Sequence, residues 1–168
     1  IIANNYFSLT EVIKTNSPSM DITISSNFER ILAESFNPEE LSDLYQNLIN
    51  HSHNPKLDET VHEQLAGKFK SEYATSEEVQ KCIKKYFDSN KVLIDPHTAV
   101  GVVCAEKMNL SNHMCMACAH PVKFQETVTK SLGHEIEYDK NFEFKSSEKF
   151  EILKNDYNLL KEFILNNA

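Results

Sequence analysis

NHMCMACAHPVKFQETVTKSLG, residues Asn112 to Gly133, is the stretch that decides the fold expected for this chain. Its apolar first half predicts a short buried strand from Met114 to Ala119. A helix is expected to begin at Pro121, because proline lacks the N–H that would have no partner in a first helical turn, and Gly133 suits the left-handed turn that often follows a helix. A buried strand that runs into a helix predicts an α/β, helix-rich fold with a ligand site where the helix begins.

The composition bounds the kind of protein. The chain has 168 residues, of which 40% are apolar and 25% charged, as in one soluble globular domain. A net charge of −8 disfavours a nucleic-acid binder, since no basic face could displace counterions from phosphates. The longest apolar run, Ala99 to Ala105, is far below the roughly 20 residues that a membrane-spanning helix needs. The first residues, IIANNYF, begin without methionine, so we expect this chain to be part of a longer one.

The four cysteines, Cys82, Cys104, Cys115 and Cys118, each lie in an apolar pattern, so we expect buried free thiols in a reducing cytoplasm rather than disulfides. Cys115 and Cys118 have the Cys-x-x-Cys spacing of zinc sites and redox pairs. On a strand, however, side chains three positions apart point to opposite faces. We therefore expect no metal site, and a zinc-binding interaction domain is the alternative that metal analysis would test.

A mainly helical stretch is predicted from about residue 37 to 90. Asn37, Asp58 and Ser76 are each followed by apolar residues at helical spacing, so we expect them to cap three successive helices. Ahead of this stretch, residues 26–29 (SNFE) have the form of a capping box and predict a further helix from Asn27. Residues 11–15 (EVIKT) are rich in β-branched side chains and predict a strand.

A second helix start follows this stretch. Asp95 and Pro96 are typical of an N-cap and a first helical position, which predicts a strand end at 92–94 and a helix over 96–107. The apolar run from Ala99 to Ala105 fits a buried helix or a strand, and its periodicity does not decide between them. His97 and Thr98 stand at the start of that helix, where they either cap it or face a ligand. With the helix start next to His120, they predict a cleft.

The last part of the chain has two expected elements. Residues 134–145 predict a charged, irregular segment that holds a strand. Ser147 is expected to cap a final amphipathic helix with apolar positions at Phe150, Leu153, Tyr157, Leu160 and Ile164.

The residues alone do not name a reaction. The chain has only three glycines, Gly67, Gly101 and Gly133, which are too scattered for a glycine-rich phosphate loop. No Gly-x-Ser-x-Gly motif frames a serine nucleophile. The chemistry stays open at this point.

Three stretches in order carry a resemblance to a known family. SPSMDITISSNFER (Ser17–Arg30), LIDPHTAVGV (Leu93–Val102) and ACAHPVKFQE (Ala117–Glu126) resemble the C-terminal part of threonine synthase, in the branch typical of bacteria and fungi. The resemblance implies a tryptophan-synthase-β-like fold (fold type II) that uses pyridoxal 5'-phosphate. It also implies conversion of O-phospho-L-homoserine and water to L-threonine and phosphate. Residues 1–168 would then be the C-terminal portion of the large cofactor-binding domain.

The resemblance also implies roles for individual residues. In the family's Ser-Thr-Ala-His-Pro motif the threonine hydrogen-bonds the pyridine nitrogen of the cofactor, and Cys118 stands at that position here, where it is either a cofactor contact or a small buried side chain. Asn27 and Arg30 resemble residues of the family's Ser-Asn-Phe-Glu-Arg motif and are expected to face the substrate. Arg30 has the alternative of an ion pair with Glu34, one turn further on.

No lysine of this chain is expected to be catalytic. The Schiff-base lysine and the phosphate loop lie earlier in the family's chain, so the missing N-terminal part is the expected partner and this segment alone is expected to be inactive. Two alternatives are a threonine-synthase-like phospho-lyase that acts on a related phosphorylated compound, and a non-catalytic binding module of the same fold. The Thr-to-Cys change at Cys118 favours the second.

Overall fold

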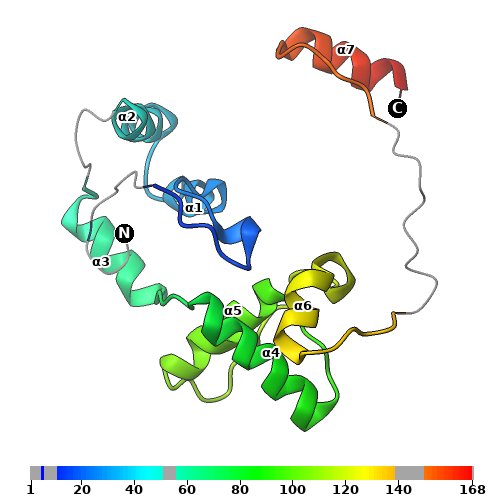
Figure 1. Ribbon diagram of the computed structural model, residues 1–168. Coiled ribbons are helices and arrows are strands. Elements are labelled where there is room, and N and C mark those ends of the chain that lie inside the picture. The colour runs from blue at the N-terminus through cyan, green and yellow to red at the C-terminus, as the bar shows by residue number, and fades with distance from the viewer. Residues whose placement is uncertain (1–4, 6–10, 51–55, 139–149, 168) are drawn as a thin grey trace. The chain divides into compact units, whose positions relative to one another are not determined.

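The computed structural model describes residue 5 and residues 11–50, 56–138 and 150–167. The chain divides into a larger unit, Ile1–Ile136, and a smaller unit, Glu137–Ala168. Figure 1 shows helices joined by irregular segments in the larger unit and helix α7 in the smaller one.

The described residues of the first half of the larger unit include the α-helices α1 (Ser26–Leu32), α2 (Pro38–Ile49) and α3 (Glu59–Lys68). The expected caps are confirmed for α2 and α3. Asn37 accepts hydrogen bonds from the first turn of α2 within a full capping box, and Asp58 accepts one from the N–H of Thr60. These helices bury one cluster of leucines: Leu32, Leu41, Leu48, Leu57 and Leu65.

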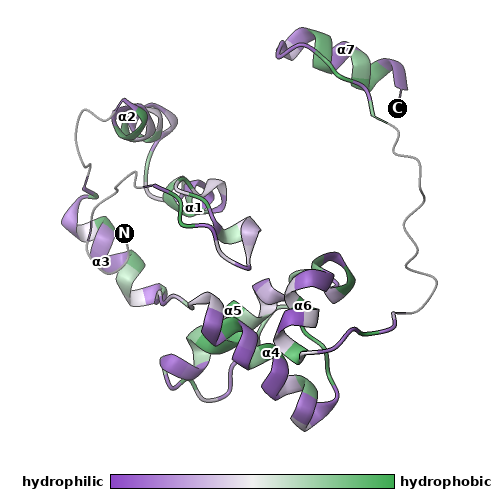
Figure 2. Cartoon of the chain, viewed as in Figure 1, coloured by the Kyte–Doolittle hydropathy of each residue, from purple (hydrophilic) through white to green (hydrophobic). Residues whose placement is uncertain are grey.

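The second half of the larger unit contains α4 (Ser76–Asn90), α5 (Pro96–Lys107), the short 3-10 helix η2 (Pro121–Phe124) and α6 (Gln125–Leu132). Helix α4 packs against both α5 and α6. Apolar residues run along much of α5 (Figure 2), and its side chains are buried from Pro96 to Ala99 and from Val102 to Ala105. The core here consists of Val79, Cys82, Ile83, Ala99, Val102 and Val103.

The ends of these helices largely follow the sequence signals. Helix α5 has the predicted bounds and the predicted cap, Asp95. Gly133 ends α6 in the left-handed conformation, with φ 79°. The expected cap of α4 was wrong by one residue, because the side chain of Thr75, not Ser76, accepts the hydrogen bond from Glu78 N–H.

The predicted strands are absent from the described parts of the chain. Residues 11–15, 92–94 and 114–119 have an irregular backbone, and the 114–119 stretch is not buried, since Met114 is 87% exposed and Met116 is 73% exposed. A strand forms only where a neighbouring strand supplies hydrogen bonds, and the described residues supply none. Within 134–145, residues 134–138 are also irregular, and the remainder of that prediction lies outside the described residues.

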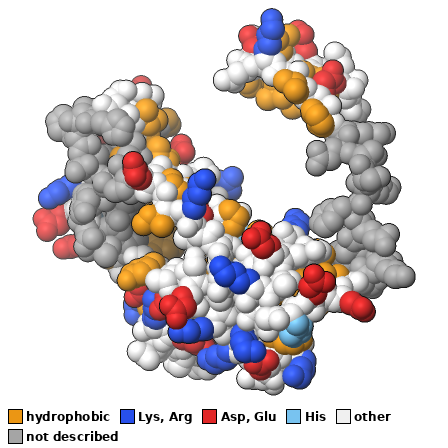
Figure 3. All heavy atoms as spheres, in the orientation of Figure 1, with side chains coloured by type: hydrophobic (Ala, Val, Ile, Leu, Met, Phe, Trp, Pro, Cys, Tyr) orange, Lys and Arg blue, Asp and Glu red, His pale blue; other side chains and the backbone are white. Residues whose placement is uncertain are grey.

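The smaller unit contains α7 (Tyr157–Asn167). Asp156 caps it by accepting hydrogen bonds from the N–H groups of Asn158 and Leu159. The predicted cap, Ser147, lies outside the described residues, and Phe150 and Leu153 precede the helix rather than belonging to it. Apolar side chains of α7 are exposed (Figure 3). Over the described ranges, no helix is long and apolar enough to cross a membrane.

Candidate functional site

A cavity of about 700 Å³ lies in the larger unit, between residues that are far apart in the sequence. One wall comes from the 3-10 helix η1 (Pro18–Met20) and the segment that leads into α1, and it includes Ser19 and Asn27. The other wall comes from the start of α5 and from residues 118–124. The cavity therefore brings together Asn27 and Cys118, two of the residues expected at a ligand site.

Asp95, the cap of α5, is the buried centre of the polar contacts beside this cavity, and its side chain is only 1% exposed. Its Oδ1 accepts hydrogen bonds from the backbone N–H groups of His97 (2.9 Å) and Thr98 (3.4 Å). Its Oδ2 accepts from the hydroxyl of Thr98 and from the N–H of Ala119, at 3.3 Å for the latter. Burial opposes ionisation, but these hydrogen bonds outweigh it and lower the pKa of the Asp95 carboxyl.

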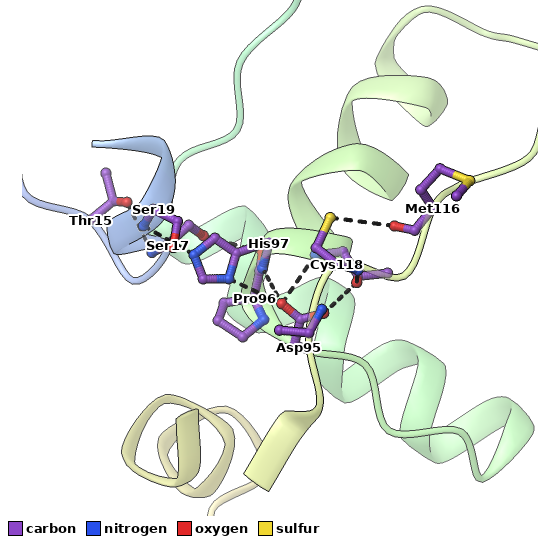
Figure 4. Close-up of polar contacts among 10 residues, drawn as sticks. Thr15, Ser17, Ser19, Asp95, Pro96, His97, Met116 and Cys118 are labelled. Atoms are coloured by element: carbon purple, nitrogen blue, oxygen red, sulfur yellow. Dashed lines mark hydrogen bonds and ion pairs between the residues drawn. The ribbon is translucent and has the colours of Figure 1, made fainter. Parts of the chain in front are cut away.

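His97 lines the cavity in one defined tautomer. Its Nδ1 lies 3.1 Å from Oδ1 of Asp95, and its Nε2 accepts a hydrogen bond of 3.1 Å from the backbone N–H of Ser19 (Figure 4). A carboxylate only accepts and a backbone N–H only donates, so Nδ1 carries the proton and Nε2 is unprotonated. The ring packs against Phe124, with the two ring centroids 4.7 Å apart. His97 therefore connects α5 to η1.

Thr98 makes the matching connection to the opposite wall. Its hydroxyl donates to Asp95 and accepts a hydrogen bond of 3.0 Å from the backbone N–H of Cys118. A hydroxyl has one hydrogen and two lone pairs, so it can satisfy both partners at once. The backbone on which Cys118 sits is therefore attached to the start of α5.

The segment before η1 is fixed by local and long-range hydrogen bonds. Asp21 accepts from the N–H and the hydroxyl of Thr15, each at 2.7 Å. These hydrogen bonds, first from the backbone and then from the side chain of Thr15, lower the pKa of Asp21. Ser17 is buried and donates from its hydroxyl to the carbonyl oxygen of Pro96 at 3.2 Å. The wall that carries Ser19 is thus attached to α5 at two neighbouring residues, Pro96 and His97.

The predicted site residues have different positions in the structure. Cys118 lines the cavity with an exposed thiol, whose Sγ lies 3.5 Å from the carbonyl oxygen of Met116. Asn27 is exposed and lines the same cavity. Arg30 is exposed and is not among the lining residues, and the contacts found among the described residues include no ion pair between Arg30 and Glu34.

The predicted cleft is only partly as expected. His97 lines it, whereas His120 caps η2 by accepting a hydrogen bond of 3.2 Å from the N–H of Val122 and is not among the lining residues. Sequence reasoning missed Lys123 and Phe124, which line the cavity one turn into η2. The signal was available, because both residues lie in the same motif as Cys118 and directly after a helix start.

The two thiols of the Cys-x-x-Cys motif have different surroundings. Cys115 is half-buried and packs against the core between α4 and α5, whereas Cys118 is exposed at the cavity. In the part of the chain that the structure describes, no three His, Cys, Asp or Glu side chains gather closely enough to hold a metal ion. All four cysteines are free thiols, but only Cys82 and Cys104 are buried, so the expectation that every one is buried was wrong for the half-buried Cys115 and the exposed Cys118.

The lining of the cavity suits a ligand with a flat ring and negative charge. Lys123 contributes a cation, and no acidic side chain is found among the described lining residues. Asn27 supplies hydrogen-bond donors and an acceptor, and Cys118 supplies a thiol, a weak donor and acceptor. The aromatic pair of His97 and Phe124 offers an apolar surface.

Comparison with known proteins places the chain in a family. The family model described as threonine synthase, C-terminal, matches residues 98–164. The chain is 36% identical to threonine synthase of Schizosaccharomyces pombe over 76% of its own length and 28% of that protein. It is 30% identical to threonine synthase of Saccharomyces cerevisiae over 73% of its own length and 28% of that protein.

A solved structure agrees with the sequence relatives. The chain superposes on the crystal structure of PLP-bound threonine synthase from Brucella melitensis, with a TM-score of 0.75 and 29% identity. The match covers 98% of this chain and 37% of that one, so the chain spans little more than a third of the solved relative. The described helices thus share the fold of part of a fold type II enzyme. The chain belongs to the threonine synthase family and corresponds to the C-terminal part of its members.

Proposed function

We propose that this chain is the C-terminal part of a threonine synthase, which converts O-phospho-L-homoserine and water to L-threonine and phosphate in threonine biosynthesis. Residues 1–168 form the C-terminal portion of its large cofactor-binding domain. The rest of the protein supplies the lysine that binds pyridoxal 5'-phosphate and the loop that holds its phosphate. Family membership supports this proposal, as does the greater length of the relatives. We place the protein in the cytoplasm, in keeping with its free thiols.

One observation carries the proposal beyond family membership. Cys118, which stands where the family has a cofactor-binding threonine, lines the same cavity as Asn27, which stands where the family has a substrate-side residue. These residues come from two distant parts of the chain, and the hydrogen bonds of His97 and Thr98 hold their backbones to one helix start. A cavity of about 700 Å³ is in the size range of small-molecule sites.

The residues present fit one edge of pyridoxal 5'-phosphate. When bound, the cofactor supplies the electron sink for carbanion chemistry. Cys118 would hold the pyridine nitrogen by a weak hydrogen bond, and a thiol does not keep that nitrogen protonated as a carboxylate would. Asp95 would not take this role, because it is not among the lining residues and hydrogen bonds from His97, Thr98 and Ala119 occupy its two oxygens.

The substrate side of the cavity suits a phosphorylated amino acid. Asn27 orients polar groups of the substrate through its amide, and Lys123 contributes positive charge. Arg30 does not line the cavity, but it lies three positions after Asn27 on α1, a spacing that places both on one face of a helix, and we propose it as a second cation near that side. Both cations favour a substrate that carries phosphate.

The test uses the full-length protein. We expect a visible absorbance band of the bound cofactor and phosphate release that depends on O-phospho-L-homoserine. Cys118→Thr should keep the band and raise turnover, and Cys118→Ala should shift the band or weaken cofactor binding. Cys115→Ala is the matched control, because that thiol packs against the core and is not among the lining residues. A well-folded protein with no band would contradict the enzyme proposal.

The same assay separates the activity of the whole protein from that of this chain. The 168-residue chain alone is expected to release no phosphate, since it has no glycine-rich phosphate loop and, by family resemblance, no cofactor lysine. Adding it to the missing N-terminal part should restore turnover if the two parts associate. Turnover by the chain alone would show that this assignment of the lysine is wrong.

Two other functions are tested by the same measurements. A threonine-synthase-like phospho-lyase would bind the cofactor but act on a different phosphorylated compound. A non-catalytic binding module is favoured by the thiol of Cys118, a weaker hydrogen-bond partner than the family's hydroxyl. Cofactor binding without turnover of any phosphorylated amino acid, in the wild type and in Cys118→Thr, would select the binding module.

A further inference from the structure

The two walls of the cavity meet at a single carboxylate. The oxygens of Asp95 reach one wall through His97 and the other through Thr98 and Ala119. We infer that Asp95 is a positioning residue that holds both walls in place. His97 connects it by hydrogen bonds to the wall that carries Ser19, and Thr98 connects it to the wall that carries Cys118. The inference rests on the proposed function for what the walls bind.

The connection from Asp95 and Thr98 to the Cys118 wall consists of two parallel hydrogen bonds. The N–H of Cys118 donates to the Thr98 hydroxyl at 3.0 Å, and the N–H of Ala119 donates to Oδ2 of Asp95 at 3.3 Å. Consecutive N–H groups are therefore held by two acceptors that are themselves hydrogen-bonded. This arrangement fixes the backbone on which the exposed thiol sits, although neither Asp95 nor Thr98 is among the cavity-lining residues.

The connection from Asp95 to the Ser19 wall is a chain of two hydrogen bonds through the imidazole of His97. Because Nδ1–H of His97 donates to Oδ1 of Asp95, Nε2 is left as an acceptor that faces the N–H of Ser19. Figure 4 shows the imidazole between Asp95 and the η1 segment. Without the carboxylate, the other tautomer would place an N–H against the N–H of Ser19.

A carboxylate is needed because every partner of Asp95 is a donor. The N–H of His97, the Nδ1–H of His97, the N–H and hydroxyl of Thr98 and the N–H of Ala119 all point at its two oxygens. An amide at this position would turn one oxygen into a donor NH₂ and oppose at least one of these groups. Asp95→Asn is therefore expected to loosen one or both walls.

The two connections, one through His97 and one through Thr98, can be tested separately by amide hydrogen exchange of the 168-residue chain. Thr98→Val removes the hydroxyl at nearly constant volume, and we expect exchange at Cys118 to rise about tenfold while Ser19 stays within about twofold. Thr98→Ser keeps a hydroxyl and should restore slow exchange at Cys118. His97→Leu should give the opposite pattern, with about tenfold faster exchange at Ser19 and little change at Cys118.

A general loss of stability would give a different result. It would raise exchange equally at amides of the α4 core, such as that of Ile83, which is fully buried. The inference is overturned if Thr98→Val leaves Cys118 unchanged, or if Cys118 and Ile83 change by the same factor. Asp95→Asn should affect Ser19 and Cys118 together, and if it fails to fold, the Thr98 and His97 variants still decide.

The full-length protein supplies a second readout. Thr98→Val should weaken cofactor binding about fivefold or more with little change in KM, and Thr98→Ser should rescue it. His97→Leu should raise KM for O-phospho-L-homoserine by a larger factor than it weakens cofactor binding, which is the reverse of the Thr98→Val pattern. If the protein binds no cofactor but the exchange patterns appear, the proposed function fails and the assignment of Asp95 stands. If the cofactor binds and the exchange patterns are absent, the assignment fails and the function stands.

Discussion

The ammonium group of Lys107 lies 2.8 Å from Oε1 of Glu78, which joins the end of α5 to the start of α4. Glu78 also accepts hydrogen bonds from the N–H and the hydroxyl of Thr75 in the capping box of α4. The hydrogen bond from Lys107, followed by those from Thr75, lowers the pKa of Glu78 to about 2. A single carboxylate thus serves a helix start and a contact between two helices.

Replacing this carboxylate should make stability less dependent on pH. A lowered pKa means that the contribution of Glu78 is complete above the ordinary value of 4.5 and is lost as the pH falls towards about 2. Glu78→Gln keeps a side chain that can complete the capping box but loses the charge. We expect a melting temperature a few degrees below that of the wild type at pH 7, and a difference that shrinks below pH 4.5, measured by circular dichroism.

The matched control for this substitution is Glu77→Gln. Glu77 pairs with Lys81 at 2.6 Å within α4, but its side chain is 75% exposed and the pair joins no second helix. Exposed pairs of this kind contribute little. Equal losses for the two variants would contradict the role assigned to the Glu78–Lys107 contact.

The cap of α2 provides a second test of stability. Asn37 accepts hydrogen bonds from the N–H groups of Glu39 and Glu40, each at 3.0 Å. Asn37→Ala should cost about 1 kcal/mol and lower the melting temperature by about 2–4 °C. Asn50→Ala, at the opposite end of the same helix, is expected to change stability by no more than about 0.5 kcal/mol. The prediction fails if the two variants melt alike.

Two left-handed residues should respond in opposite directions to substitution. Lys91 follows α4 with φ 57°, and Gly133 follows α6 with φ 79°. Lys91→Gly removes the strain of a side chain in this conformation and should stabilise by up to about 1 kcal/mol, whereas Gly133→Ala introduces it and should destabilise by about 1 kcal/mol. No atom lies within 4 Å of a Cβ built at Gly133, so the loss would come from the backbone alone. Urea denaturation of both variants measures the two signs.

The four thiols should react at different rates with a thiol-specific disulfide reagent. Cys118 is exposed and should react first. Burial, together with the charge of Glu106, raises the pKa of Cys82 to about 11, and burial also raises the pKa of Cys104, so both should react only after unfolding. Loss of the fast phase in Cys118→Ser would identify it, and a fast phase that persists in this variant would contradict the assignment.

Short-range rules predicted much of this structure. Asp95 with Pro96, Asn37 with Glu40, and Gly133 define helix ends through hydrogen bonds and dihedral angles within a few residues, and the structure confirms all of them. The cavity between Asn27 and Cys118 could not be derived from spacing, because it depends on contacts between distant segments. Only the resemblance to a family placed these residues at one site beforehand.

The failures came from features that depend on distant partners. The stretch from Met114 to Ala119 has the composition of a buried strand, but whether it pairs and is buried depends on a neighbouring strand. Asp95 was expected only as a cap, and the donors that reach it from His97 and Ala119 became visible only in three dimensions. A local sequence pattern shows which hydrogen bonds a side chain can make, but it does not show which distant residues become its partners in the fold.

The described core of the larger unit contains two clusters of buried residues with no member in common. Leu32 is fully buried in the cluster of α1 to α3, and Ile83 is fully buried in the cluster of α4 and α5. Leu32→Ala and Ile83→Ala should each cost about 2–5 kcal/mol, but in different unfolding transitions. Denaturation followed by probes in each half would show this, and identical shifts in both probes would refute it.

This division of the core bears on the cooperativity of unfolding. When two hydrophobic clusters share no side chain, one can open while the other stays folded, and the chain then has no single free energy of unfolding. Opening the Leu32 cluster would release the segment that carries Asn27 and leave Cys118 with the start of α5. One half of the cavity would thus persist in a partly unfolded state, and a ligand that touches both halves would make the two transitions merge into one.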